Sequence, residues 1–121
     1  IQREVLLYAL RMKRDGSGLV LQDYKSDYIR PYEDGKTKAI RAWVSPLYDG
    51  RDPVLIGGDS MGDYWMLTEF PEMRVGLIID KGQTGPIGEL REQALDAETG
   101  GAPSRYVLQR RGDPEPKFSR N

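Results

Sequence analysis

Two aspartates four positions apart form the part of the chain best suited to chemistry. Asp59 and Asp63 lie in the stretch Gly58-Asp59-Ser60-Met61-Gly62-Asp63, directly after an apolar run at residues 53–57. Two carboxylates that face one point repel each other unless a cation lies between them. A hard divalent cation with oxygen ligands, Mg²⁺ first, would remove that repulsion. The alternative is structural: Asp59 caps a helix, and Asp63 interacts favourably with the helix dipole.

The composition excludes several other chemistries. The 121 residues include no cysteine and no histidine, which excludes thiolate and imidazole metal sites, Cys nucleophiles and Ser-His-Asp triads. The 18 Lys and Arg residues nearly balance 19 Asp and Glu residues, so the net charge of -1 gives no reason to expect a nucleic acid or an acidic membrane as partner. No apolar run approaches the ~20 residues of a membrane span. The lack of cysteine leaves the compartment open, because periplasmic, secreted and cytoplasmic proteins can all do without it.

The elements around these aspartates predict an α/β fold with a Rossmann-like parallel sheet and flanking helices. Apolar runs at residues 53–57 and 75–79 are typical of strands buried on both sides, and residues 106–108 predict a further short strand. Helices are expected from residue 35 to 44 or 47, with Asp34 as N-cap, and at residues 64–70 and 87–95. Ligands of such sheets bind beyond the carboxyl ends of the strands. Asp59 follows one such end, and Asp80-Lys81, a further site or an ordinary solvated pair, follows the next.

The two ends of the chain differ from this middle part. Residues 5–12 and 19–22 flank the turn sequence KRDGSG and predict a β-hairpin, although the first run also favours a helix. Residues 109–121 are rich in charge and proline and predict a polar tail after a domain at residues 1–108. The first residue is Ile1 rather than methionine, and we expect the chain to be the interior of a longer one.

The string GDSMGDYWML at residues 58–67 closely resembles the fourth motif of the haloacid dehalogenase (HAD) superfamily. Its GDSxGDxxML form is common in phosphatases related to phosphoserine phosphatase and phosphorylcholine phosphatase. Gly35-Lys36, about twenty residues earlier, resembles the third motif of the same family. We choose Lys36 over Lys38 because two residues correspond to ~200° around a helix, so both cannot face one crevice. The stretches VGLIIDKGQTGPIGEL and YVLQRRGD look most like the phosphorylcholine-phosphatase branch.

The resemblance implies an Mg²⁺-dependent phosphatase that hydrolyses a small phosphomonoester through an aspartyl-phosphate. By this resemblance Asp59 is a direct or water-mediated Mg²⁺ ligand, and Asp63 orients the waters of the metal or supports the loop. Lys36 would offset the charge of the nucleophile and the phosphate. Ser60 would contribute its backbone N–H or its hydroxyl to phosphate binding.

The chain departs from the family in the first two motifs. The DxDxT motif, which carries the nucleophile, is absent, and the Ser or Thr of the second motif has no good candidate. The resemblance therefore implies the C-terminal portion of a HAD-like core. An N-terminal segment or a second polypeptide would supply the nucleophile, the cap and two strands between the hairpin and residues 53–57. The alternative is a non-catalytic α/β binding or regulatory module, which the missing nucleophile favours if the chain acts alone.

Overall fold

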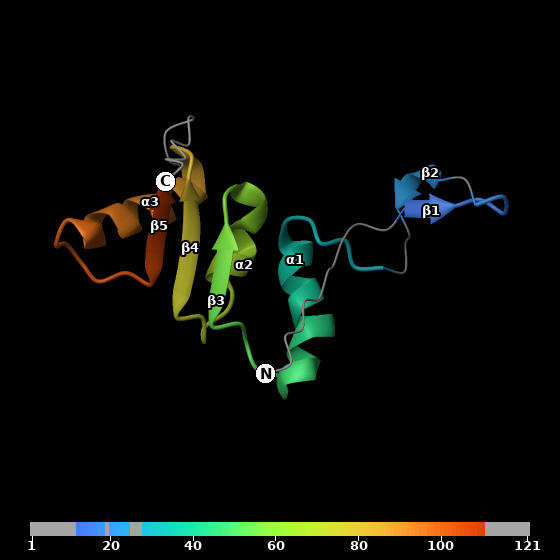
Figure 1. Cartoon of the computed structure of the whole chain (residues 1–121), viewed down its shortest axis with the longest axis horizontal. Helices are drawn as coiled ribbons and strands as arrows, with labels where there is room; N and C mark the ends of the chain where they lie inside the picture. Colours follow the sequence, from blue (N-terminus) through green and yellow to red (C-terminus); the bar gives the residue numbers. More distant parts are fainter. Residues whose placement is uncertain (1–11, 19, 25–27, 111–121) are drawn as a thin grey trace, which may run out of the picture. The chain divides into compact units, whose positions relative to one another are not determined.

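The computed structural model describes residues 12–18, 20–24 and 28–110, and the chain divides into two compact units (Figure 1). The described residues of the first unit, Ile1–Arg51, form a hairpin and a helix, and those of the second, Asp52–Asn121, form a parallel sheet with two α-helices. This confirms the predicted α/β class. Within the described ranges, no helix is long and apolar enough to cross a membrane.

The predicted hairpin is present, but its described strands lie later than expected. β1 (Met12–Arg14) pairs antiparallel with β2 (Val20–Tyr24). The turn between them is closed by Asp15, whose carboxylate accepts hydrogen bonds from the backbone N–H and the hydroxyl of Ser17, and by Gly18 at a φ of 86°. A positive φ of this kind is easily adopted by glycine. β1 therefore includes two residues that the sequence assigned to the turn, and the apolar run before Met12 lies outside the described residues.

The helix of the first unit has the predicted extent but a different start. It begins as α1 (Asp34–Ala39), continues as a π-helical segment (Ile40–Val44) and ends in a 3-10 turn (Ser45–Tyr48). The predicted N-cap is wrong: Glu33 occupies the capping position with a φ of 48°, and Asp34 is the first helical residue. The Asp34 carboxylate instead accepts a hydrogen bond from Lys38, one turn later on the exposed surface. Such i,i+4 pairs stabilise a helix modestly.

The second unit is built on a parallel sheet in the order β3-β4-β5. The strands are β3 (Leu55–Gly58), β4 (Val75–Asp80) and β5 (Tyr106–Arg110). All three predicted strands are confirmed, with ends that differ by one or two residues. β5 continues through Gln109 and Arg110, which the sequence assigned to the tail, because these residues pair with Ile79 and Asp80 of β4.

Both helices of the second unit lie on one face of this sheet. α2 (Tyr64–Thr68) connects β3 to β4, and α3 (Gly85–Glu98) connects β4 to β5. Crossovers between parallel strands are right-handed, and both crossovers proceed in the same direction across the sheet, so both helices must cover the same face. The hydroxyl of Tyr106 on β5 accordingly donates a hydrogen bond of 3.1 Å to the Leu67 carbonyl of α2. α2 ends before the predicted residue 70, and α3 extends beyond the predicted 87–95 at both ends.

The core lies between this face and the two helices. The Tyr106 ring packs so closely on Gly76 that a Cβ there would stand 2.6 Å from a ring carbon. Real side chains do not tolerate such a distance, so the aromatic ring requires glycine on the neighbouring strand. The other buried apolar side chains among the described residues of the second unit are Ile56, Leu67, Phe70, Met73, Ile78, Ile87, Leu90 and Ala94.

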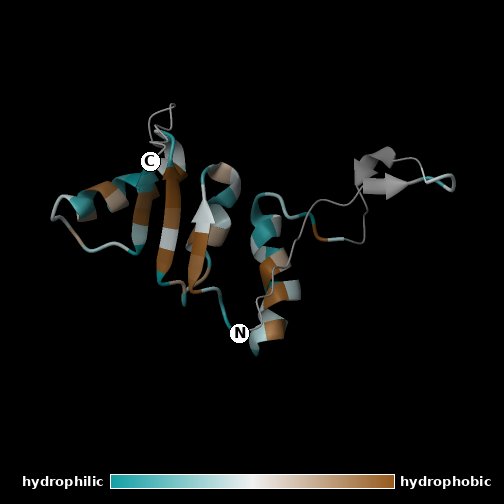
Figure 2. Ribbon diagram, in the orientation of Figure 1, coloured by the Kyte–Doolittle hydropathy of each residue, from teal (hydrophilic) through white to brown (hydrophobic). Residues whose placement is uncertain are grey.

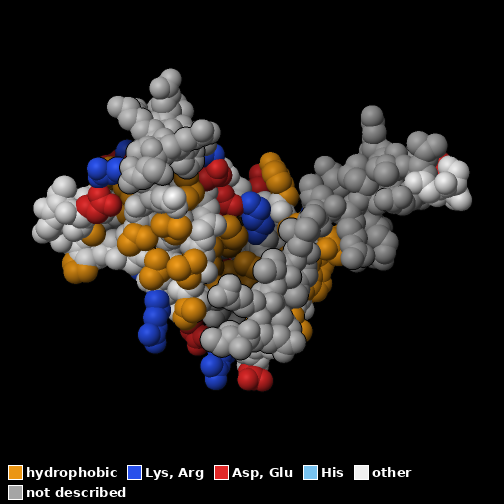
Figure 3. All heavy atoms as spheres, in the orientation of Figure 1, with side chains coloured by type: hydrophobic (Ala, Val, Ile, Leu, Met, Phe, Trp, Pro, Cys, Tyr) orange, Lys and Arg blue, Asp and Glu red, His pale blue; other side chains and the backbone are white. Residues whose placement is uncertain are grey.

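The opposite face of the sheet is apolar and partly exposed. Leu55 is 61% and Val107 43% exposed, whereas Val75, Leu77 and Ile79 are half-buried. Residues paired across parallel strands share a face, and Leu55 pairs with Val75 as Leu77 pairs with Val107. These five side chains form one surface, which we call the open face. The strands carry brown, hydrophobic stretches in Figure 2, and orange, hydrophobic side chains gather over them in Figure 3. The prediction that residues 53–57 are buried on both sides is therefore wrong, because Leu55 is 61% exposed and the helices α2 and α3 cover the opposite face.

Candidate functional site

The carboxylate of Asp63 holds the loop after β3. Ser60 caps a 3-10 turn (Met61–Asp63), and the two side chains form a reciprocal capping box. Oδ2 of Asp63 accepts hydrogen bonds from the backbone N–H of Asp59 (2.9 Å), the N–H of Ser60 (3.1 Å) and the Ser60 hydroxyl (3.1 Å). Asp63 is buried. The turn is therefore capped by Ser60 rather than by Asp59, and Asp63 organises the backbone on which Asp59 sits.

A glycine at position 58 is required for this arrangement. A Cβ on Gly58 would stand 2.4 Å from Cβ and 2.9 Å from Cγ of Asp63. A Cβ on the preceding Gly57 would have only ordinary contacts, at 3.8 and 3.9 Å from atoms of Leu77. Gly58 thus lets the buried Asp63 side chain pack directly against the end of β3.

Asp59 presents its carboxylate at the carboxyl end of β3, where it meets a cation. Its Oδ2 forms an ion pair with the Lys81 ammonium, and the side chains of Lys81 and Asp59 are 33% and 41% exposed. Lys81 directly follows β4, the neighbouring parallel strand. The carboxyl ends of adjacent parallel strands meet at one edge of the sheet, so the two loops lie together.

Gln83 ties these two loops to each other. Its Nε2 donates hydrogen bonds to the backbone carbonyls of Asp59 (2.9 Å) and Ile79 (2.7 Å), and its Oε1 accepts one from the N–H of Lys81 (3.0 Å). Sequence analysis missed Gln83 and considered Lys81 only as one half of the pair after the strand. The available signal was position: both residues follow β4, next to the loop that holds Asp59.

Asp80 anchors the second loop to α3. Its carboxylate accepts a hydrogen bond of 2.7 Å from Nε of Arg91 and one of 2.9 Å from the N–H of Gly82. The Arg91 hydrogen bond, followed by that of Gly82, lowers the pKa of Asp80 below its ordinary value, because both stabilise the charged form. The same pairing raises the pKa of Arg91. Asp80 thus has a structural partner, whereas Lys81 beside it points to Asp59.

The chemistry of Asp59 fits a hard cation. Its partly exposed carboxylate already contacts one positive charge, and carboxylate oxygens are the ligands that Mg²⁺ prefers. The described residues include no group of three or more His, Cys, Asp and Glu side chains that could hold a metal ion. Oδ2 of Asp63 is engaged with three donors. This loop would therefore provide Asp59 as the ligand of a cation, and Asp63 would hold the loop in place. The other ligands would be water molecules or residues from other parts of the protein.

Lys36 lies on α1 in the first unit, and its predicted place facing the crevice stays a prediction. It follows Gly35, where a Cβ would stand 1.8 Å from the Arg30 carbonyl oxygen, so this position of the Gly-Lys pair accepts glycine alone. Lys36 is half-buried. Lys38 is exposed and forms an ion pair with Asp34, and the choice of Lys36 over Lys38 stays a prediction.

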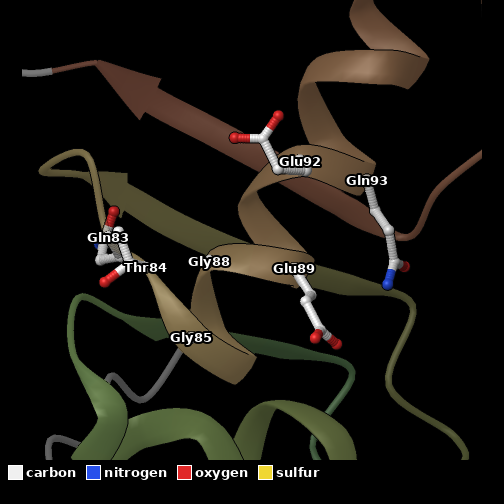
Figure 4. Close-up of a pocket in the computed structure, with 7 residues that line it drawn as sticks. All are labelled: Gln83, Thr84, Gly85, Gly88, Glu89, Glu92 and Gln93. Atoms are coloured by element: carbon white, nitrogen blue, oxygen red, sulfur yellow. The ribbon is translucent and has the colours of Figure 1, made fainter.

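A cavity of about 540 Å³ opens along the start of α3 (Figure 4). It is lined by Gln83, Thr84, Gly85, Gly88, Glu89, Glu92 and Gln93. Gln83 therefore belongs both to the link between the loops and to the wall of this cavity. Two glutamates in the lining disfavour an anionic ligand, so we do not assign phosphate binding to it.

The comparisons with known proteins support the fold alone. No protein-family model matches the chain, and no curated protein is significantly similar to it. A solved structure that is similar is that of a conserved, functionally unknown protein from Anaerococcus prevotii, with a TM-score of 0.70 and 26% sequence identity. The match covers 88% of this chain and 30% of that one. The chain thus spans less than a third of the length of this neighbour.

Proposed function

We propose that the chain is the C-terminal portion of an Mg²⁺-dependent phosphatase of the HAD type, which hydrolyses a small phosphomonoester. The observation that carries this proposal is the loop of residues 58–63. A buried Asp63 fixes the backbone, and the carboxylate of Asp59 stands partly exposed at the carboxyl end of β3. This is the edge of a parallel sheet at which ligands bind.

Each residue of the loop has a distinct task in this proposal. Asp59 holds the cation, which when bound stabilises charge on the transferring phosphoryl group. Asp63 keeps the N–H groups of Asp59 and Ser60 turned inward, so that the Asp59 side chain points out of the loop. The Ser60 hydroxyl is shared between Asp63 and the proposed phosphate. Lys36 supplies a compact positive charge that offsets the phosphate and the nucleophile.

The nucleophile and the cap would come from an N-terminal segment or a second polypeptide. Among the described strands, β3 lies at the edge of the sheet and pairs with β4 alone. The open face is apolar, and parallel sheets are normally covered on both faces. A strand beside β3, with helices over the open face, would satisfy both. The Anaerococcus protein, which is more than three times as long as the matched region, has room for such a segment.

One observation favours a second candidate, a non-catalytic α/β binding or regulatory module. Lys81 already balances the charge of Asp59, so the carboxylate has a structural role that needs no metal. The two candidates differ in Mg²⁺ binding. A module of this kind needs none, whereas the phosphatase requires Asp59 to bind the ion.

The test is Asp59→Asn in the complete protein. We expect Mg²⁺-dependent hydrolysis of para-nitrophenyl phosphate to be lost, with an unchanged far-ultraviolet circular dichroism spectrum, because the amide carries no charge for the cation. Asp49→Asn is the matched control: it removes the same charge at an exposed position with a φ of 57°, which asparagine also adopts readily. Full turnover of Asp59→Asn at saturating Mg²⁺ would refute the role of Asp59. A complete protein that neither binds Mg²⁺ nor turns over would favour the binding module.

A further inference from the structure

The loop after β4 places a lysine where the proposed metal would bind. Lys81 and Asp59 belong to different loops, and their ion pair joins the carboxyl ends of β3 and β4. The exposed pairs of Lys38 with Asp34 and Arg110 with Glu98 are remote from the loop of Asp59 in the sequence, and their carboxylates belong to helices. Among the ion pairs of the described residues, the Lys81 pair involves the Asp59 carboxylate directly.

A hydrogen bond to Gln83 fixes the backbone of Lys81, whereas its side chain is long and partly exposed. The amide of Gln83 bonds the N–H of Lys81 and the carbonyl of Asp59 at the same time. On the other side, Asp80 accepts a hydrogen bond from Gly82 and is bound to Arg91. The Lys81 side chain has four rotatable bonds and is a third exposed. The ammonium takes part in none of these loop hydrogen bonds, so they do not depend on its contact with Asp59.

We propose that Lys81 is a built-in counter-ion of Asp59, and that a divalent cation binds the Asp59 carboxylate by displacing the Lys81 ammonium. The inference rests on the proposed role of Asp59. An ammonium and Mg²⁺ compete for the same carboxylate oxygen, and the lysine removes the cost of a bare carboxylate while no metal is bound. Lys81 thereby lowers the affinity of Asp59 for a divalent cation.

The expected effect is small and has a definite sign. Ion pairs with this degree of exposure are weak, so replacement of the lysine by an uncharged side chain should tighten Mg²⁺ binding only about two- to five-fold. A lysine that instead helped to hold the metal site together would give the opposite sign, a weaker binding of Mg²⁺.

The test is isothermal titration of the complete protein with MgCl₂ alone, without substrate. We expect Lys81→Met to lower the dissociation constant about two- to five-fold. Arg74→Met is the matched control, because it removes the same charge from an exposed residue directly before β4, at the opposite edge of the sheet, and should leave the constant unchanged. In the ¹³C spectrum of reductively methylated protein, the Lys81 resonance, assigned by its loss in Lys81→Met, should shift with the midpoint of the titration.

The outcomes separate the two proposals. An unchanged or weaker Mg²⁺ affinity of Lys81→Met, while Asp59→Asn still abolishes binding, would overturn the counter-ion role and leave the proposed function intact. An equal gain of Mg²⁺ affinity in Arg74→Met would show a general charge effect and would overturn the counter-ion role as well. A wild-type protein that binds no Mg²⁺ would overturn both.

Discussion

Replacement of Gly58 by alanine is expected to disrupt the loop that presents Asp59. The added Cβ would stand 2.4 Å from Cβ of Asp63, at the end of β3, so the Asp63 side chain must move. Overpacking of this kind costs about 1–3 kcal/mol, and each hydrogen bond of Asp63 that is lost contributes about 1 kcal/mol more. We therefore expect the free energy of unfolding of the complete protein to fall by about 2–4 kcal/mol.

Gly57→Ala is the matched control for this change. It adds the same methyl group one residue earlier on the same strand, where the nearest atoms are 3.8 Å away. The loss of glycine restricts the unfolded chain, so the free energy of unfolding should stay unchanged or rise by about 0.4–1 kcal/mol. Both variants add one methyl group to β3, but the group at position 58 alone would clash with Asp63.

Urea denaturation followed by circular dichroism measures both free energies of unfolding. Calorimetric titration measures the Mg²⁺ affinity, which reports on the loop of Asp59 separately from overall stability. We expect Gly58→Ala to bind Mg²⁺ more weakly than Gly57→Ala does. Equal stability and equal Mg²⁺ affinity of the two variants would refute the reasoning that the packing of Asp63 on Gly58 positions Asp59.

Two further predictions concern the other charged groups. In the complete protein, Lys36→Ala should lower phosphatase turnover on the order of tenfold or more and Lys38→Ala far less, because Lys38 is engaged with Asp34 on the exposed surface. The reverse ranking would move the third motif by two residues. Arg91→Met should raise the pKa of Asp80 toward its ordinary value of 3.8, since the Arg91 hydrogen bond is the main cause of its lowering. A carboxyl group with a lowered pKa stabilises the fold above its unfolded-state pKa and loses that contribution as the pH falls through the folded-state value. Arg91→Met should thus lower the free energy of unfolding by its full amount above about pH 4, and this difference from the wild type should disappear in stronger acid. Urea denaturation across this pH range measures the difference. A difference that is independent of pH would contradict the pairing of Arg91 with Asp80.

The elements of the second unit could be predicted because their signals are local. The apolar residues 75–79 lie between charged residues, and β4 ends within one residue of the prediction. The ends of α3 were placed too far inward, since the polar residues of its first and last turns are as typical of loops as of helices. The start of α1 was wrong for a related reason: Asp34 is a good N-cap by type, but Glu33 takes that position, and Asp34 bonds to Lys38 instead.

The interior of β3 shows the limit of such local signals. An apolar run has the same composition whether one or both of its faces are covered. Ile56 is buried and Leu55 is 61% exposed, because α2 and α3 are both confined to one side of the sheet. That confinement follows from the order of the strands and the handedness of the crossovers, and neither is encoded in residues 53–57.

By itself, the sequence determined that Asp59 and Asp63 share a glycine-rich loop after a strand, because strand and turn preferences act over a few residues. Only the tertiary structure decided which groups meet them. Gln83 reaches the carbonyl of Asp59 across 24 positions of sequence, and Lys81 reaches its carboxylate, because β3 and β4 are parallel neighbours whose carboxyl ends coincide. That pairing arises from backbone hydrogen bonds between segments far apart in the chain, so it cannot be predicted from the spacing of residues along either loop.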